Sequence, residues 1–520
     1  MTFPSLLLHG LRVVALLSLG AGPGAAQTEP VPVAAAVSSV AELRARLDAL
    51  VTQPRFNGAL WGVKVDSLDT GRTLFEHHAD RWLSPASNTK LYTAALVLDQ
   101  LGGDYRIVTP IYGAGKPDAA GTLAGDVVVA GRGDPSWKAR GGSKDFWSTF
   151  DPLVAVLERA GVRRIAGDVV ADATWFQALP QGAGWAADDL NDYYGAEISA
   201  IALEDNYAEL KVTPGARVGE RCGFALVQPK TGLVLDNRTT TIAKGGKRRI
   251  EAVRLLGENV VHVFGELPAG DKEEVVDVTV PRPAAWFAAA FREALERKGI
   301  HVEGGARGLR WPDAPAVGAT SVKLGEVTSP PLRDLVTTLM KPSQNLETDL
   351  LFAHLGELRR AADAPAAPGS RSAEDYGVVA LREFLQKNGL PADEVRFEEG
   401  SGLSRNNLTT ANATVALLKF MATHREGKGF AEALPIAGRD GSLRRRMKGT
   451  AAEGNVRAKT GSLRYANSLS GYVTTAAGER LAFSLMLNRN GQPAGRSARE
   501  ELDDVAVLLA QLTGRSDAGR

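Results

Sequence analysis

Cysteine is nearly absent from this sequence, which contains only Cys222 among 520 residues. A single cysteine can form neither an intrachain disulfide nor, without a second thiol, a cysteine-based metal site. The sequence also lacks H-E-x-x-H and G-x-S-x-G, the signatures of zinc hydrolases and of α/β-hydrolases. These absences argue against both enzyme classes, and we expect neither a metal nor an organic cofactor.

An excess of charge of either sign is also missing. The 61 lysines and arginines nearly balance the 60 aspartates and glutamates, and no basic cluster is interleaved with aromatic residues. Such a cluster is typical of nucleic-acid-binding proteins, so we expect no nucleic-acid partner. Beyond the first 26 residues, no run reaches the ~18 apolar residues of a membrane-spanning helix. This predicts no transmembrane segment in the mature chain.

The N-terminus has the pattern of a secretory signal peptide over residues 1–26. An apolar stretch that includes 13–17 precedes the small residues of 21–26, which offer a cleavage site. Residues 2–9 contain no lysine or arginine, so the start is atypical, and a disordered N-terminus is the alternative. The signal interpretation predicts an exported protein of the periplasm or cell envelope.

The middle of the chain differs from its two ends in its expected secondary structure. Outside the middle, we expect helices at 40–51, 91–98, 332–340, 346–355, 376–388 and 499–512 and strands at 59–65, 72–76, 468–474 and 480–488. A helix at 284–298 is expected to close the middle region. The middle contains short strands between glycine and aspartate turns, at 106–110, 125–130, 165–170, 210–212 and 260–264. This order is typical of an α/β domain interrupted by a long β-rich insertion.

Ser87 and Lys90 form the one place in the sequence where a serine stands three residues before a lysine. The apolar run at 91–98 predicts a buried helix, on which the hydroxyl and the amine would share one face. The hydroxyl would lie at the helix N-terminus, where free N–H groups and the dipole favour an anion. A serine acyl-transfer enzyme with a lysine base requires this combination of nucleophile, base and part of an oxyanion hole.

Two further motifs follow in the chain. Ser343 and Asn345 form an S-x-N triplet at the end of a predicted helix, and Lys459, Thr460 and Gly461 form a K-T-G triplet before the strand-rich end. S-x-x-K, S-D-N and K-T-G are the motif set of penicillin-binding proteins and class A β-lactamases. Taken alone, each triplet is more simply explained as a helix end or a solvated strand residue. The presence of all three in the required order favours a catalytic role.

The chain also contains two copies of these motifs that we set aside. A second K-T-G at 230–232 precedes the S-x-N triplet and breaks the required order, so we interpret it as a hairpin turn. A second S-x-N at 404–406 has no helix immediately before it. Neither is expected to take part in chemistry.

The motif residues suggest a division of roles. Ser87 would attack a carbonyl, and Lys90 must be neutral to accept its proton, which burial and a nearby cation both favour. Lys459 could be that cation and could also attract a substrate carboxylate. Ser343 could relay a proton to the leaving amine, while Asn345 holds a substrate amide or Lys90 in place.

The third motif would form the substrate-binding strand. Thr460 and Ser462 offer hydroxyls to a terminal carboxylate, with Gly461 between them. The backbone N–H of Ser462 could join that of Ser87 in an oxyanion hole, where losing one donor typically slows a reaction by about 10²–10³-fold.

With these motifs the chain resembles the class C low-molecular-mass penicillin-binding proteins, which are D-alanyl-D-alanine carboxypeptidases and endopeptidases. The resemblance extends over nearly all of the mature chain. The matching segments are L-S-P-A-S-N-T-K at 83–90, G-R-G-D-P-S-W at 131–137, D-D-L-N-D-Y-Y-G-A at 188–196, D-N at 205–206, G-S-G-L-S-R-N-N-L at 400–408 and G-R-D-G-S-L at 438–443.

The resemblance implies a transpeptidase or β-lactamase-like α/β (α+β) domain with a central antiparallel sheet, interrupted by a β-rich inserted domain that carries a further insertion. The implied boundaries are 27–105 and 326–520 for the penicillin-binding catalytic domain, 106–131 and 212–325 for the inserted domain, and 132–211 for the second insertion nested in it. The implied partners are peptidoglycan stem peptides and β-lactam inhibitors such as penicillin. The implied activity is cleavage of D-Ala-D-Ala termini, with possible cleavage of cross-links.

Two positions depart from the family pattern. Glu399 stands where an aspartate often precedes Gly-Ser-Gly, and 347–349 (Glu-Thr-Asp) replaces a run that usually ends in Ala-Glu. We expect these changes to affect fine substrate preference and not the reaction. The alternatives are a β-lactamase or esterase with the same triplets, which differs in how fast the acyl-enzyme is hydrolysed, and a non-catalytic cell-wall scaffold.

Overall fold

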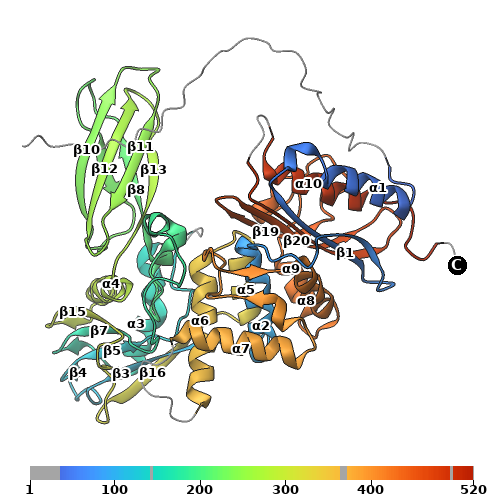
Figure 1. The fold of residues 1–520 in the computed structure, drawn as a ribbon. Helices are drawn as coiled ribbons and strands as arrows, with labels where there is room; N and C mark the ends of the chain where they lie inside the picture. The colour runs from blue at the N-terminus through green and yellow to red at the C-terminus, as the bar shows by residue number, and fades with distance from the viewer. Residues whose placement is uncertain (1–35, 141–144, 364–371, 492–495, 519–520) are drawn as a thin grey trace, which may run out of the picture.

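One five-stranded antiparallel sheet joins the two ends of the chain in the computed structural model, which describes residues 36–140, 145–363, 372–491 and 496–518 (Figure 1). Its strand order is β19-β20-β21-β1-β2. The strands are β1 (Leu60–Ser67), β2 (Thr73–His77), β19 (Arg457–Leu463), β20 (Ala466–Thr474) and β21 (Arg480–Asn488). The expected signal peptide, 1–26, lies outside the described residues.

The central strand β21 is buried on both faces. Leu481, Phe483 and Leu485 belong to a core shared with α1 (Val40–Val51) and α10 (Ala498–Ala510), whereas Ala482 belongs to the core of the helices opposite. Successive side chains of a strand point to opposite faces, so this alternation places helices on both sides of the sheet. Helix α1 begins as the sequence predicts, because Ser39 Oγ accepts the N–H of Glu42 and caps it.

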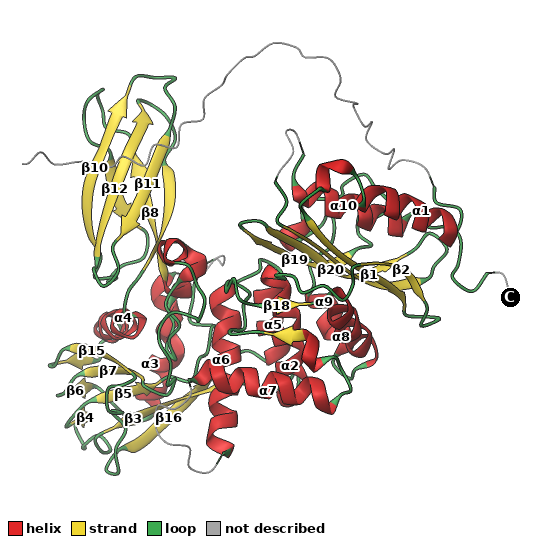
Figure 2. Ribbon diagram, viewed as in Figure 1, coloured by secondary structure: helices red, strands yellow, loops and turns green. Residues whose placement is uncertain are grey.

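A group of helices lies between this sheet and the inserted region (Figures 1 and 2). They are α2 (Thr89–Leu101), α5 (Leu332–Met340), α6 (Asn345–Ala362), α7 (Ala373–Lys387), α8 (Ala411–Thr423) and α9 (Gly427–Ala433), with the short pair β17 (Val395–Arg396) and β18 (Leu408–Thr409) beside them. Every residue of α2 from Thr89 to Leu98 is buried, which is expected of a helix that is apolar on nearly all sides. The nucleophile motif therefore opens a helix at the centre of this group.

The inserted region contains a mixed five-stranded sheet of order β15-β7-β5-β3-β16 and a small parallel sheet β14-β6-β4. The strands are β3 (Val108–Gly113), β4 (Thr122–Leu123), β5 (Val127–Ala130), β6 (Arg164–Ile165), β7 (Val169–Ala173), β14 (His301–Val302), β15 (Ala306–Arg310) and β16 (Val322–Thr328). Helices α3 (Asp151–Arg159) and α4 (Pro283–Arg297) share one hydrophobic core with them. Gly308 lets α4 approach β15 closely, since a Cβ there would lie 2.2 Å from the Ala285 nitrogen.

A separate β-sandwich projects from the inserted region (Figure 2). It consists of two three-stranded sheets, β13-β8-β9 and β10-β12-β11, whose apolar residues form one small core. Its strands are β8 (Tyr207–Thr213), β9 (Gly223–Leu226), β10 (Val234–Ile242), β11 (Arg249–Arg254), β12 (Val260–Pro268) and β13 (Glu274–Thr279).

The mixed α/β fold with its antiparallel sheet and β-rich inserted region confirms the expected fold class. The strand pairings nevertheless divide the inserted region differently from the expected boundaries. Strand β7 lies within 132–211 but pairs with β5 and β15 on either side, so this segment is not a nested unit. The nested unit is the sandwich at 207–279. Short strands between similar turns do not reveal their partners in a sequence.

The set-aside K-T-G triplet also differs from its interpretation as a hairpin turn. Residues 230–232 connect β9 to β10, and these strands belong to different sheets of the sandwich. Among the residues that the structure describes, none of the helices has both the length and the apolar composition of a membrane span.

Candidate active site

Ser87 lies at the junction of the catalytic sheet and the helices. It occupies a single 3₁₀ turn, η2 (Ala86–Asn88), that leads directly into α2. Two hydrogen bonds tie this turn to β20, from Asn88 Nδ2 to Ser470 Oγ at 2.6 Å and from Ser468 Oγ to the Pro85 carbonyl at 2.6 Å. These bonds fix the half-buried Ser87 hydroxyl beside the sheet edge.

The backbone at this turn is tightly packed and strained. Ala86 has a φ of 47°, an uncommon left-handed conformation for a residue with a Cβ. Gly402 packs directly against it, and a Cβ at Gly402 would lie 2.0 Å from the Ala86 carbonyl oxygen. Strain of this kind persists only where the surrounding structure enforces it, and it is frequent at functional sites.

Lys90 is fully buried below Ser87 and is surrounded by oxygen atoms. Its Nζ lies 3.0 Å from Ser87 Oγ, 2.6 Å from Asn345 Oδ1 and 2.6 Å from the Ser401 carbonyl oxygen. These contacts come from the turn η2, from the first residue of α6 and from the loop after Glu399. Burial lowers the pKa of Lys90 to about 8, although the nearby carboxyl groups of Asp349 and Glu399 oppose this shift.

Lys459 of the K-T-G triplet lies at the same site, beside Ser343. Its Nζ donates to Ser343 Oγ at 2.7 Å and to the Thr460 carbonyl at 2.8 Å. Burial, with the charge of Lys90 nearby, holds the pKa of Lys459 well below its usual value. Ser343 has a φ of 71°, so the second motif also contains a strained backbone. The structure thus brings together all five residues that the sequence proposed as catalytic.

The predicted substrate-binding residues divide between two positions on β19. Thr460 and Ser462 line the cleft, and Thr460 Oγ1 forms a hydrogen bond of 2.7 Å with Ser442 Oγ, which lies in the 438–443 segment. Gly461 instead faces the nucleophile turn, because a Cβ there would lie 2.5 Å from the Pro85 carbonyl oxygen. Its role is to let β19 approach that turn.

The cleft beside Ser87 has a volume of about 660 Å³ and receives residues from the inserted region. Asp188 and Asp189 from that region form ion pairs with arginines of the catalytic part, Arg464 at 3.2 Å and Arg405 at 2.6 Å. Sequence reasoning assigned no role to these residues, although they lie in the family segments 188–196 and 400–408. The side-chain types gave no hint that the two segments meet.

Two buried carboxyl groups lie beneath Lys90, at the positions that depart from the family pattern. Glu399 accepts hydrogen bonds from the N–H groups of Ser401 and Gly402 and from Asn407 Nδ2, which hold its side chain in place. Burial and the charge of Glu399 hold the pKa of Asp349 well above its usual range. The expectation that these positions affect fine substrate preference and not the reaction stays a prediction, and both carboxyl groups oppose the lowering of the pKa of Lys90.

The serine and asparagine of the second S-x-N triplet and the lysine of the second K-T-G triplet do not line the cleft, although Arg405 of the former triplet does. Lys230 is half-exposed, and its Nζ lies 3.5 Å from Glu293 of α4. Ser404 is buried and donates to Glu398 at 3.0 Å, and Asn406 donates to the same carboxylate, so the second S-x-N triplet stabilises its own loop.

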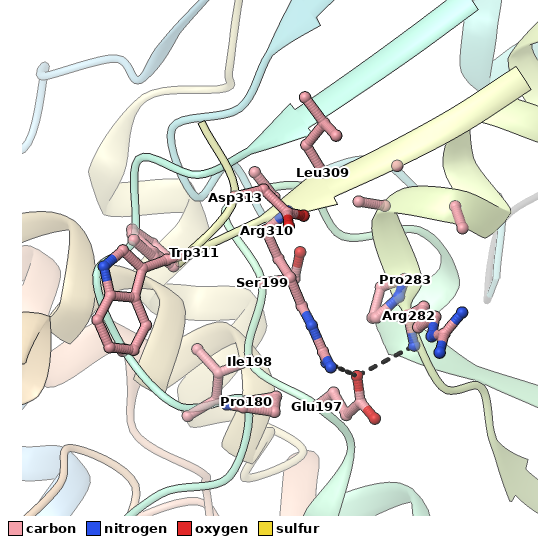
Figure 3. A pocket seen from close by; sticks show the side chains of 16 residues that line it. Pro180, Glu197, Ile198, Ser199, Arg282, Pro283, Leu309, Arg310, Trp311 and Asp313 are labelled. Carbon is pink, nitrogen blue, oxygen red and sulfur yellow. Dashed lines mark hydrogen bonds and ion pairs between the residues drawn. The ribbon is translucent and has the colours of Figure 1, made fainter. Parts of the chain in front are cut away.

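A second cavity, of about 280 Å³, lies in the inserted region and contains none of the predicted site residues. In Figure 3, Arg310 extends toward Glu197, and the two form an ion pair of 3.8 Å. Arg282 also donates its backbone N–H to Glu197 at 3.0 Å. Within the described ranges, no three or more side chains gather in a way that could hold a metal ion.

Comparison with known proteins gives consistent matches over nearly the whole chain. The model of the D-Ala-D-Ala carboxypeptidase 3 (S13) family matches residues 43–509. A D-alanyl-D-alanine carboxypeptidase of Actinomadura sp. (strain R39) is 34% identical over 511 residues, which cover 95% of this chain and 88% of that protein. The D-alanyl-D-alanine carboxypeptidase DacB of Haemophilus influenzae is 27% identical over 446 residues, which cover 84% of this chain and 87% of that protein.

A solved structure is similar to this chain over most of its length. The crystal structure of penicillin binding protein 4 (dacB) from Haemophilus influenzae has a TM-score of 0.74 at 26% sequence identity. The match covers 88% of this chain and 97% of that one. The inserted region and the catalytic part are thus both included in the similarity.

The charge state of Lys90 leads to a prediction about pH. A lysine that acts as a base must be unprotonated, so reaction of Ser87 with a chromogenic cephalosporin should be slow in acid and should accelerate as the pH rises through about 8. The measurement is the pseudo-first-order acylation rate constant over a pH series. A rate that stays flat, or that falls through this range, would contradict a lysine base.

Proposed function

The chain belongs to the D-Ala-D-Ala carboxypeptidase S13 family of serine peptidases, and we propose that it works through an acyl-enzyme on Ser87. The membership confirms the resemblance to class C low-molecular-mass penicillin-binding proteins. The observation that carries the proposal is the convergence on Lys90, whose Nζ lies within 3.0 Å of both Ser87 Oγ and Asn345 Oδ1.

In the proposed first step, neutral Lys90 accepts the proton of Ser87 as its oxygen attacks the carbonyl of the penultimate D-alanine. Negative charge develops on the carbonyl oxygen, which the backbone N–H groups of Ser87 and Ser462 stabilise. The terminal carboxylate lies by the hydroxyls of Thr460 and Ser462, and the positive charge of Lys459 attracts it.

In the proposed second step, the amine of the terminal D-alanine leaves with a proton. Ser343 Oγ is placed to deliver that proton, because Lys459 Nζ lies 2.7 Å from it and can replace the proton that it gives up. Before hydrolysis, the proton that Lys90 took from Ser87 passes to Lys459, so that Lys90 is neutral again and Lys459 regains the proton it gave to Ser343. Water then attacks the acyl-enzyme while Lys90 accepts its proton, and Lys90 gives that proton to Ser87 Oγ as the acyl bond breaks, which restores the Ser87 hydroxyl. Each group is in a position to transfer one proton without a metal or an organic cofactor.

We extend the proposal to location and ligands. Peptidoglycan stem peptides are the substrates, and β-lactams acylate the same serine because their ring carbonyl stands in for the D-Ala-D-Ala peptide carbonyl. A protein that acts on this polymer works outside the cytoplasmic membrane, which agrees with the apolar pattern at 1–26. We therefore assign it to the periplasm or cell envelope.

Replacing Ser87 by alanine tests the nucleophile. Ser87→Ala should abolish both covalent labelling by a fluorescent penicillin and D-alanine release from a D-Ala-D-Ala peptide, because no acyl-enzyme can form. The half-buried side chain loses one oxygen, so the circular dichroism spectrum should be unchanged. Labelling that persists in the variant would reject the assignment. A wild-type protein that remains unlabelled would favour the scaffold alternative, and rapid turnover of the penicillin would favour a β-lactamase.

The two K-T-G triplets give a matched pair of variants. Lys459→Ala should reduce D-alanine release by about 10²–10⁴-fold, the usual contribution of a group that takes part in proton transfer. Lys230→Ala should leave the rate close to that of the wild type, because its pair with Glu293 is far from the cleft and half-exposed. A comparable loss in both variants would mean that the wrong triplet was chosen.

The size of the cleft favours a second activity on cross-linked stem peptides. Its volume of about 660 Å³, with walls from both the catalytic part and the inserted region, is larger than a terminal dipeptide needs. Digestion of purified peptidoglycan, followed by mass analysis, separates the activities. Loss of terminal D-alanine alone indicates a carboxypeptidase, whereas conversion of cross-linked dimers to monomers indicates an additional endopeptidase. Dimers that persist after complete removal of D-alanine would contradict the second activity.

A further inference from the structure

Two family segments, at 131–137 and 205–206, have no role in the proposed reaction, yet the structure joins both to the helix of the second motif. Lys138 directly follows the first segment, and its Nζ lies 3.0 and 3.3 Å from the two carboxylate oxygens of Asp205. The same Nζ forms an ion pair with Glu347, which is almost fully buried and stands two residues after Asn345. Removing one partner of a buried ion pair is costly because the other charge is left unpaired. This contact therefore fixes the inserted region to α6.

The backbone around Asp205 is strained in a way that suggests a required shape. Glu204, Asp205 and Asn206 have φ values of 51°, 56° and 57°, so three successive residues with side chains adopt the left-handed region. Such conformations are unfavourable and need enforcement by neighbouring contacts. Here the enforcing contacts include those of Lys138 and of the Asn206 side chain.

The hydrogen bonds of Asn206 connect this strained turn to the wall of the cleft. Its Nδ2 donates to the Glu197 carbonyl at 2.8 Å, and its Oδ1 accepts from the backbone N–H of Leu203 at 2.9 Å. Glu197 is three residues after Tyr194, so the bond from Asn206 pins the segment that carries the Tyr194 carbonyl. That carbonyl reaches out of the inserted region toward α6.

The Tyr194 carbonyl determines how Asn345 is oriented. It accepts a hydrogen bond of 2.9 Å from Asn345 Nδ2, while Asn345 Oδ1 accepts one of 2.6 Å from Lys90. A carbonyl can only accept, so it fixes the amide with its nitrogen outward and its oxygen toward Lys90. With the amide reversed, an NH₂ group would face the lysine and could not receive its hydrogen bond.

We propose that Asn206 and Lys138 are positioning residues, which hold the Tyr194 carbonyl so that Asn345 keeps its oxygen on Lys90. The inserted region then acts on the reaction through a backbone atom and not through a side chain of its own. The proposal rests on the roles assigned above to Ser87 and Lys90. Since it concerns the alignment of the base, it predicts a loss in the chemical step and none in ligand binding.

Asn206→Asp tests the positioning with a minimal change. The carboxylate keeps the size of the side chain and can still accept from Leu203, and aspartate tolerates a left-handed φ. It cannot donate to the Glu197 carbonyl, and the two oxygens repel. Stopped-flow acylation by a chromogenic cephalosporin gives the binding constant and the acylation rate constant separately. The rate constant should fall by about 10–10²-fold, as for a small misplacement of a reacting group, with binding unchanged.

Asn237→Asp is the matched control. Asn237 makes the same two kinds of bond inside the sandwich, since its Nδ2 donates to the Cys222 carbonyl at 2.7 Å and its Oδ1 accepts from the Thr239 N–H at 3.1 Å. This variant should acylate at the wild-type rate. If Asn206→Asp is as fast as the wild type, or if both variants are slowed equally, the positioning role is overturned.

Two additional variants keep the outcome decisive. If Asn206→Asp fails to fold by circular dichroism, Lys138→Gln supplies the same test from the ion pair between the inserted region and α6. A slowed acylation step with unchanged binding supports the positioning role, and a wild-type rate overturns it.

Ser87→Ala in the same assay separates the two proposals. Acylation that survives in Ser87→Ala refutes the proposed function, whereas a normal rate in Asn206→Asp refutes only the positioning.

Discussion

A buried lysine that must be able to lose its proton is the constraint on which this structure depends. Taking the ammonium of Lys90 out of water is unfavourable, and the protein compensates with three oxygen acceptors, on Ser87, Asn345 and Ser401. These acceptors lie in three distant parts of the sequence. The site therefore exists only when α2, α6 and the loop after Glu399 are all in place, which couples the chemistry to the fold.

The influences on the charge of that lysine oppose each other. Burial favours the neutral amine of Lys90, whereas the nearby carboxyl groups of Asp349 and Glu399 favour the ammonium. Because Glu399 also fixes the loop that carries the Ser401 carbonyl, one side chain sets both the geometry and the electrostatics of the base. The inserted region contributes in a comparable way through the Tyr194 carbonyl. It is thus part of the site and not only an appendage that extends the cleft.

The sequence predicted the residues that act by their chemical type and missed those that act by their place in the fold. The three triplets follow from spacing and order, and α1 follows from apolar periodicity and the Ser39 cap. The pairing of β7 with β5 and β15 could not be predicted, because short strands between glycine turns do not identify their partners. The contact of Tyr194 with Asn345 could not be predicted either, since it uses a backbone oxygen that any residue would supply.

Mass mapping of the penicillin-treated protein identifies the acylated residue. Trypsin should release residues 82–90 as one peptide, because Arg81 and Lys90 flank the segment. The penicilloyl adduct should lie on this peptide, fragment ions should place it on Ser87 and not on Ser84, and adduct formation should slow as the pH falls below about 8. An adduct on any other residue would rule out Ser87 as the nucleophile, and an adduct that forms equally fast when Lys90 is protonated would rule out Lys90 as its base.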